Sequence, residues 1–193
     1  MRNLRKYTTL TITGSLLYVI TIWLLHGARP ELQFDQSYVS NFLEGRLGWV
    51  AIIVFWANAY GAWVLPRALV PLGIQEHALI SRLLRTFAVG YAIAAVTMQA
   101  PVIHGITAYM TFLSLPLAAI LVWARQRNQP SWKRQARTSL ILGIVQLWSV
   151  LFAWQAFGVF VGERVLILSE ITWLVWFAFI VRSKLGQSSS RQA

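Results

Sequence analysis

Six long apolar segments alternate with shorter polar connections along the chain. Each contains about 18 to 25 mainly apolar residues, the length that a helix needs to cross a hydrocarbon core of about 30 Å. The segments lack the alternation of period two that is typical of a membrane barrel, and helices satisfy their own backbone hydrogen bonds in lipid. The pattern therefore predicts an all-α fold, a bundle of six transmembrane helices. The predicted spans are Thr8 to Leu25, Leu47 to Leu69, Leu79 to Met98, His104 to Ala124, Thr138 to Phe160 and Arg164 to Val181.

The basic residues predict how these helices cross the membrane. Lys and Arg are enriched in short loops on the cytoplasmic side. All but three of the 17 basic residues lie before the first span, after the sixth span, or in the second and fourth connections and the span ends beside them. The three exceptions are Arg29, Arg46 and Arg164. We therefore expect both termini in the cytoplasm and a long outer loop between the first two helices.

Both ends of the chain need a separate interpretation. The first apolar run follows basic residues, as a secretory signal peptide would. His26-Gly27-Ala28 matches a small-x-small cleavage site poorly, so we expect a retained signal anchor. Residues 1–185 then form one transmembrane domain, and the polar, Ser-rich segment 186–193 is expected to be a disordered cytoplasmic tail.

Composition supports the membrane prediction and limits the possible partners. The chain is 57% hydrophobic and 12% charged, about half the charged fraction of a typical soluble protein. The basic residues that give the chain its net charge of +11 cluster near the connections between the spans. We therefore expect these residues to contact anionic headgroups on the cytoplasmic face of the inner (plasma) membrane. We expect no nucleic acid as a partner. The absence of Cys excludes disulfides and thiolate metal sites.

The longest connection, about His26 to Arg46, lies on the predicted outer side and exceeds the usual length of a structureless loop. Tyr38 with Phe42, and Val39 with Leu43, are spaced four residues apart, as on one face of a helix. The spacing predicts a short amphipathic helix. Such a helix either covers a cavity between the spans or rests on lipid headgroups, and the pattern leaves both open.

Two predicted spans carry polar residues. In the fourth span His104, Thr107, Thr111 and Ser114 share one helical face. The sixth span carries Glu170 about two turns from its start. Ionisable residues in membrane helices are candidates for function, and each could equally make a structural hydrogen bond.

A metal site is not expected. His26, His104 and several carboxylates lie on the same predicted side, but they lack a known ligand spacing such as HExxH. We therefore expect no metal and no other cofactor.

Three short segments resemble one known family. The first is the outer loop, Arg29-Pro30-Glu31 through Ser40-Asn41-Phe42-Leu43-Glu44-Gly45-Arg46-Leu47-Gly48-Trp49; the others are His104-Gly105-Ile106 and Gly162-Glu163-Arg164, followed by Trp173. With the six-helix layout, they make the chain similar to an uncharacterised prokaryotic membrane family, domain of unknown function 998. Its members often carry an acidic residue just before span four, where this chain has Gln99 and Ala100. The resemblance implies no established reaction, and it implies an outward cluster of Ser40, Glu44, Trp49, His104, Glu163 and Arg164.

The sequence thus favours an outward-facing polar pocket, roofed by the first outer loop, that binds a lipid or another amphipathic molecule. The main alternative is an intramembrane enzyme acting on lipids, with His104 as base, Ser40 as nucleophile or Glu44 as acid. Two further alternatives are a transporter and a structural membrane subunit. The transporter is disfavoured because no repeat relates the two halves of the chain. No motif assigns a catalytic residue. The candidate pocket residues are Ser40, Glu44, Trp49, His104, Thr107, Glu163, Arg164 and Glu170.

Overall fold

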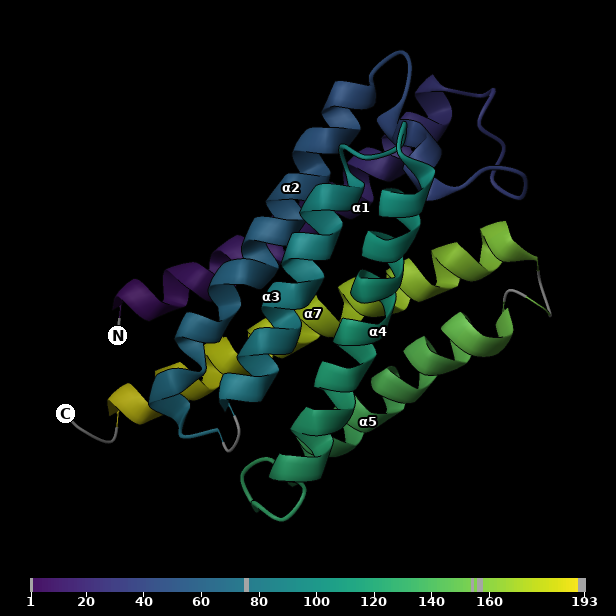
Figure 1. Ribbon diagram of the computed structural model, residues 1–193. Helices are drawn as coiled ribbons and strands as arrows, with labels where there is room; N and C mark the ends of the chain where they lie inside the picture. The colour runs from purple at the N-terminus through teal and green to yellow at the C-terminus, as the bar shows by residue number, and fades with distance from the viewer. Residues whose placement is uncertain (1, 75–76, 154, 156–157, 191–193) are drawn as a thin grey trace.

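The computed structural model describes residues 2–74, 77–153, 155 and 158–190, and over these residues it contains helices and no strand (Figure 1). The all-α prediction is therefore confirmed for this part of the chain. The long helices are α1 (Arg2–Ala28), α2 (Gly48–Val64), α3 (His77–Ala94), α4 (Pro101–Gln126), α5 (Lys133–Trp148) and α7 (Val159–Ser190). Shorter helical segments are η1 (Val39–Leu43), η2 (Leu65–Ala68), η3 (Val70–Leu72) and the π-helical η4 (Ser149–Ala153).

Five helical segments of the described chain are long and apolar enough to cross a membrane, so the chain is a multi-pass membrane protein. They are Leu4–Ala28, Gly48–Leu72, Pro101–Gln126, Lys133–Phe152 and Val159–Gln187. Helix α3 packs in the same bundle, but its 18 residues include His77, Arg82 and Arg85, which lower its hydropathy. A sixth crossing by α3 stays a prediction.

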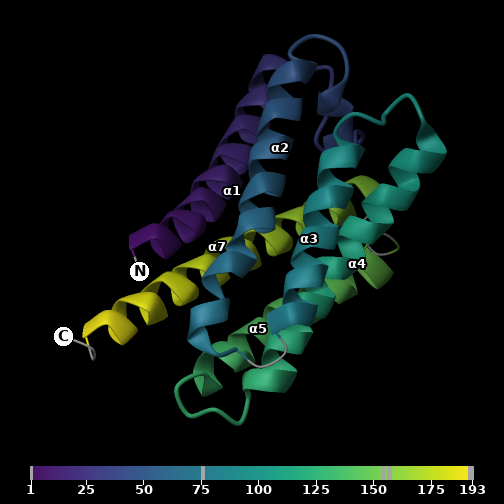
Figure 2. The ribbon, with the colours of Figure 1, turned by 60° about the vertical axis from the view of Figure 1, so that its left-hand side comes forward.

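The helices pack against their neighbours in chain order, and α7 packs on both α1 and α5 (Figures 1 and 2). Small residues allow the closest contact, between α1 and α2. A Cβ atom added at Gly14 would collide with the carbonyl of Ala57, and one added at Gly61 would lie 2.8 Å from the Cα of Thr11. Close backbone approach at small residues is the usual packing mode of membrane helices.

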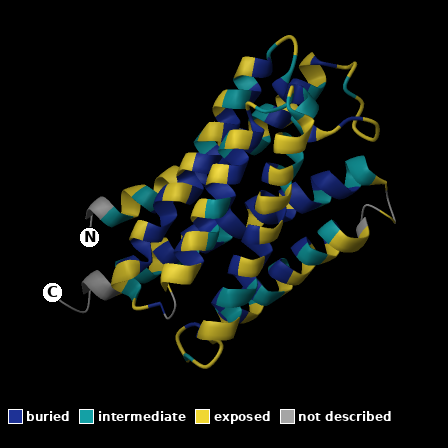
Figure 3. Ribbon diagram, in the orientation of Figure 1, coloured by how far each residue is buried: buried dark blue, intermediate teal, exposed yellow. Residues whose placement is uncertain are grey.

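Buried residues face the inside of the bundle, whereas its outer faces carry many exposed positions (Figure 3). Large apolar side chains are among the exposed residues: Leu24 is 66% exposed, Ile53 54% and Ile141 62%. Exposed apolar side chains on the outside of a helix bundle suit contact with lipid chains, because lipid offers them an apolar solvent.

The basic segments meet at one end of the bundle, which we call the basic end. Lys184 of α7 donates a 2.6 Å hydrogen bond to the carbonyl of Ser131 between α4 and α5. The guanidinium of Arg67 lies 5.4 Å from the ring centroid of Tyr7. The start of α1 and the end of α7 also lie at this end (Figure 1). The opposite end, which we call the loop end, carries residues 29–47, residues 95–100 and the start of α7.

Two boundaries differ from the sequence prediction. The predicted fifth span runs to Phe160, but α5 ends at Trp148, η4 follows, and Gly158 adopts a positive φ of 82° just before α7. Helix α7 also continues to Ser190, beyond the predicted end of the sixth span at Val181. The disordered tail over residues 186–193 stays a prediction. Residues 191–193 of that tail lie outside the described residues.

Candidate functional site

The first outer loop folds against the loop end of the bundle. Its centre is the 3₁₀ segment η1, in which Val39, Phe42 and Leu43 are buried. Phe42 is completely covered, and its ring lies 4.5 Å, centroid to centroid, from that of His26 on α1. Burial of these apolar side chains holds the loop onto the helices, since removing apolar surface from water is favourable.

Glu163 and Arg164, in the second turn of α7, bind the backbone of this loop. The Oε2 atom of Glu163 accepts a 2.8 Å hydrogen bond from the amide of Val39. The Nη1 atom of Arg164 donates hydrogen bonds to the carbonyls of Ser37 (2.6 Å) and Phe160 (3.0 Å). Adjacent helical residues point about 100° apart, so the two side chains hold the loop from different directions.

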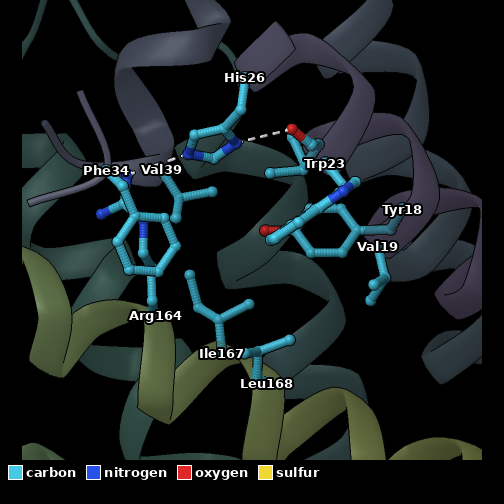
Figure 4. Close-up of a pocket in the computed structure, with 10 residues that line it drawn as sticks. Tyr18, Val19, Trp23, His26, Phe34, Val39, Arg164, Ile167 and Leu168 are labelled. Atoms are coloured by element: carbon cyan, nitrogen blue, oxygen red, sulfur yellow. Dashed lines mark hydrogen bonds between the residues drawn. The ribbon is translucent and has the colours of Figure 1, made fainter. Parts of the chain in front are cut away.

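His26 fixes the position of the Arg164 guanidinium (Figure 4). The Nδ1 atom of His26 lies 2.9 Å from the carbonyl of Ile22, and Nε2 lies 3.3 Å from Nη2 of Arg164. A carbonyl can only accept, so Nδ1 carries the proton and Nε2 accepts from the guanidinium. The guanidinium also lies 4.5 Å from the ring centroid of Phe34, a cation–π distance.

Arg164 borders an apolar cavity of about 100 Å³ between α1 and α7. Figure 4 shows Tyr18, Val19 and Trp23 on one side of it and Ile167 and Leu168 on the other. Nη1 of Arg164 binds two carbonyls and Nη2 binds His26, whereas Nε is buried without a hydrogen-bond partner among the described residues. Most of the residues that line this cavity are apolar.

A second and larger cavity, of about 250 Å³, lies between η1, α4 and α7 and is called here the α4–α7 cavity. Ser40, His104 and Glu163 supply polar groups to it from three separate segments. The complete lining is Tyr38, Ser40, His104, Gly105, Ala108, Tyr109, Phe112, Val159 and Glu163. A smaller, deeper cavity shares Ser40, His104, Ala108, Phe112 and Glu163, and it reaches Tyr91 and Thr111.

The polar groups of the α4–α7 cavity are held in place. His104 Nδ1 lies 3.1 Å from the carbonyl of Ala94, so Nδ1 donates and Nε2 keeps its lone pair. Glu163 uses Oε2 for the Val39 amide, and within the described part of the chain its Oε1 has no hydrogen-bond partner. No Lys or Arg lines this cavity. It therefore combines the acceptor atoms of His104 and Glu163 and the Ser40 hydroxyl, which can donate or accept, with aromatic and aliphatic walls.

Five of the eight candidate residues do not line the α4–α7 cavity. Glu44 accepts a hydrogen bond from the side chain of Gln99, and Trp49 is 66% exposed. Thr107 is buried and bonds to the carbonyls of its own helix. Arg164 borders the other cavity. The predicted cluster is thus split, and the structure brings together Ser40, His104 and Glu163.

Glu170, the remaining candidate, lies inside the bundle. It is 1% exposed, and neither carboxyl oxygen has a hydrogen-bond partner among the described residues. Two other buried residues of the bundle, Tyr18 and Tyr91, pack against each other with their ring centroids 5.6 Å apart. Phe55 packs against both tyrosine rings, at 5.0 and 4.7 Å between centroids, so the three rings form one aromatic cluster.

Sequence reasoning missed the contribution of Arg29. Its Nη1 atom donates a 2.6 Å hydrogen bond to the carbonyl of Glu44, and its Nε atom donates to Glu31 at 2.9 Å. This hydrogen bond lowers the pKa of the Glu31 carboxyl. A basic residue on the predicted outer side was the only signal, and it could not show that Arg29 closes the loop by binding its far end.

The same geometry bears on catalytic and metal chemistry. No hydrogen bond joins His104 to Ser40 or Glu44 in the part of the chain that the structure describes. The described residues also contain no group of three or more His, Asp or Glu side chains that could hold a metal ion.

Comparison with known proteins gives one match. No curated protein and no solved structure matches the chain. The family model described as "Protein of unknown function (DUF998)" matches residues 12–180. This range includes η1, His104, Glu163 and most of the bundle, and it agrees with the resemblance in the outer loop and in the starts of α4 and α7. The chain therefore belongs to the DUF998 family of proteins of unknown function.

Proposed function

We propose that this protein binds a lipid or another amphipathic small molecule in the α4–α7 cavity, at the outer side of the inner membrane. The observation that carries the proposal is the convergence of Ser40, His104 and Glu163 in one cavity of about 250 Å³. Most binding cavities for small molecules combine apolar walls with a few placed polar groups. The positive-inside rule favours a cytoplasmic position for the basic end, and this supports an outer position for the cavity at the opposite end.

The cavity favours a ligand whose polar end donates hydrogen bonds. Glu163 Oε1 and His104 Nε2 both present lone pairs, and the lining contains no cationic side chain. A hydroxyl or amine head would donate hydrogen bonds to these acceptors. A carboxylate or phosphate head has mainly acceptor oxygens, which would lie unfavourably close to the Glu163 carboxyl oxygens. The apolar part of the ligand would lie against Ala108, Phe112 and Val159.

The acceptors are held in position before a ligand binds. The Val39 amide fixes one oxygen of Glu163, and the Ala94 carbonyl fixes the ring of His104. Groups that are already ordered lose less conformational entropy on binding, so more of the interaction energy contributes to affinity.

The proposal is tested by mass spectrometry of the molecules that co-purify with the protein. Glu163→Gln and His104→Ala should both reduce the bound amphiphile. The matched control is Asp35→Asn, which changes an exposed acid of the first outer loop. It should leave the amount of bound amphiphile unchanged. Thermal unfolding of each variant shows whether the fold is kept. Unchanged co-purifying amphiphile in both folded cavity variants would overturn the proposal.

The polarity of the ligand head is tested by titrating dodecylamine, dodecanol and dodecanoate into protein reconstituted in nanodiscs of neutral lipid. Empty nanodiscs correct for partitioning into the bilayer. Dodecylamine and dodecanol should bind, and dodecanoate should bind at least about tenfold more weakly because Glu163 repels it. Dodecanoate binding as tightly as dodecanol would show that the cavity is not selective for donors.

Catalysis on a lipid is the second candidate function. Its supporting observation is that Ser40 and His104 line one cavity and that Nε2 of His104 is free to act as a base. Incubation with isotope-labelled lipid extract should release a product with the wild-type protein and none with Ser40→Ala. Product release that Ser40→Ala leaves unchanged would exclude Ser40 as the nucleophile.

A further inference from the structure

A third cavity, of about 300 Å³, lies at the basic end between the η2–η3 segment and the start of α3. We propose that this basic cavity binds a phosphate group. Three arginines, a histidine and a serine contribute to it. The complete lining is Pro66, Arg67, Val70, His77, Ala78, Ser81, Arg82 and Arg85.

The η2–η3 side of the basic cavity is rigid. Leu65, Ala68 and Leu69 are completely buried, so the segment is anchored in the core of the bundle. Pro66 and Pro71 restrict the backbone within it, because the proline ring fixes φ. Arg67, in contrast, is exposed. Its backbone therefore holds a fixed position while its side chain reaches the cavity.

Aromatic rings position two of the arginines. The guanidinium of Arg67 lies 5.4 Å from the ring centroid of Tyr7, and that of Arg85 lies 5.4 Å from the ring centroid of Trp63. Both distances fit cation–π contacts. A guanidinium stacked on a ring keeps the N–H groups at its edge available, which is the part that binds phosphate oxygens in a bidentate manner.

Helix α3 presents the opposite wall. His77, Ser81 and Arg85 follow one another at intervals of four residues and therefore share a helical face. The Ser81 hydroxyl and a ring N–H of His77 can donate hydrogen bonds to an anion beside the guanidinium groups. All five polar side chains of the lining can thus act as donors.

Within the described part of the chain, the three guanidinium groups have no carboxylate partner. The ion pair found there, Arg29–Glu31, lies at the loop end. Glu76, the acidic residue nearest in sequence, lies outside the described residues. Like charges gathered in one concave site repel each other, and a bound anion relieves this repulsion. A phosphate matches both the charge and the donor geometry.

The phosphate could belong to a lipid headgroup or to a soluble molecule, and the chemistry of the cavity is the same for both. The basic end lies where a bilayer surface would meet the helices, and anionic lipids concentrate near such clusters of Lys and Arg. The experiment therefore needs one arm for each source.

Inorganic phosphate and glycerol phosphate are titrated into the full-length purified protein in detergent. In parallel, the protein is reconstituted in nanodiscs of neutral lipid with and without phosphatidic acid, and bound lipid is counted by native mass spectrometry. The test variant is Arg82→Gln with Arg85→Gln. The matched control is Arg134→Gln with Arg137→Gln, which removes two exposed arginines from the same end of the bundle but outside the cavity.

The test variant should lose at least about tenfold in affinity for the phosphate ligand, and the control should change it little. Binding of glycerol phosphate identifies a soluble ligand, and binding of phosphatidic acid alone identifies a headgroup. Equal losses in test and control variants would mean that diffuse surface charge is responsible, and this would overturn the proposal. Failure of the wild-type protein to bind in either arm would overturn it as well. Both results are independent of the α4–α7 cavity at the other end.

Discussion

The carboxylate of Glu163 accepts a hydrogen bond from the backbone amide of Val39, which is 124 residues away in the chain. Val39 is 3% exposed and Glu163 6%, so the bond is shielded from solvent. It joins the first outer loop to α7 and at the same time orients Glu163 toward the α4–α7 cavity. The loop and the cavity are therefore expected to respond together to substitutions at position 163.

Glu163→Ala should lower the stability of the protein more than Glu163→Gln does. Gln keeps an oxygen that can accept from the Val39 amide, whereas Ala leaves a buried N–H without a partner, at a cost of about 1 to 3 kcal/mol. Thermal unfolding in detergent measures the difference. Hydrogen exchange at residues 37–43 should rise in the Ala variant. Equal unfolding temperatures for the two variants would contradict this role of the hydrogen bond.

Arg164 and His26 should be energetically coupled. The guanidinium donates one hydrogen bond to His26 Nε2 at 3.3 Å and another to the Ser37 carbonyl. Removing either side chain therefore leaves the other less firmly oriented. A double-mutant cycle with His26→Ala and Arg164→Ala should give a coupling of about 0.5 to 3 kcal/mol. Additive effects would show that the two side chains act independently. Arg46→Ala, in an exposed part of the same loop, is the control.

Close packing of α1 and α2 predicts different results for two glycines. Gly61→Ala places a methyl group 2.8 Å from the Cα of Thr11 and should destabilise the protein by about 1 to 3 kcal/mol. Gly27→Ala meets nothing within 4 Å and should be neutral or stabilising by up to about 1 kcal/mol, because Ala is the better helix former. Thermal unfolding of both variants checks the contrast, and an equal effect would argue against this interface.

The helical architecture and the grouping of basic segments were predictable from the sequence because both follow from local composition. Apolar runs must be helical in lipid, and Lys and Arg mark the polar connections between them. The end of α5 was not predictable, since the residues from Val150 to Val161 are almost continuously apolar. Only Gly158, with its positive φ, marks the turn into α7.

The candidate site was predictable in part. Ser40, His104 and Glu163 were expected at one end of the bundle, and they share a cavity. The separation of Glu163 from Arg164 was not expected, because adjacent residues in a helix point in different directions and only the packing decides which cavity each meets. The aromatic cluster of Tyr18, Phe55 and Tyr91 was missed because an apolar run gives no sign of which of its aromatic residues will pack together.

Glu170 gives the last prediction. Its carboxyl group is buried and has no hydrogen-bond partner among the described residues, and a polar group buried in this way costs about 1 to 3 kcal/mol. Glu170→Met removes the polar atoms and keeps a side chain of similar length that packs adaptably, so it should raise the unfolding temperature. Glu170→Gln retains a buried polar group and should raise it less. A lower unfolding temperature for Glu170→Met would mean that the carboxyl group contributes a stabilising interaction, and this result would contradict the prediction.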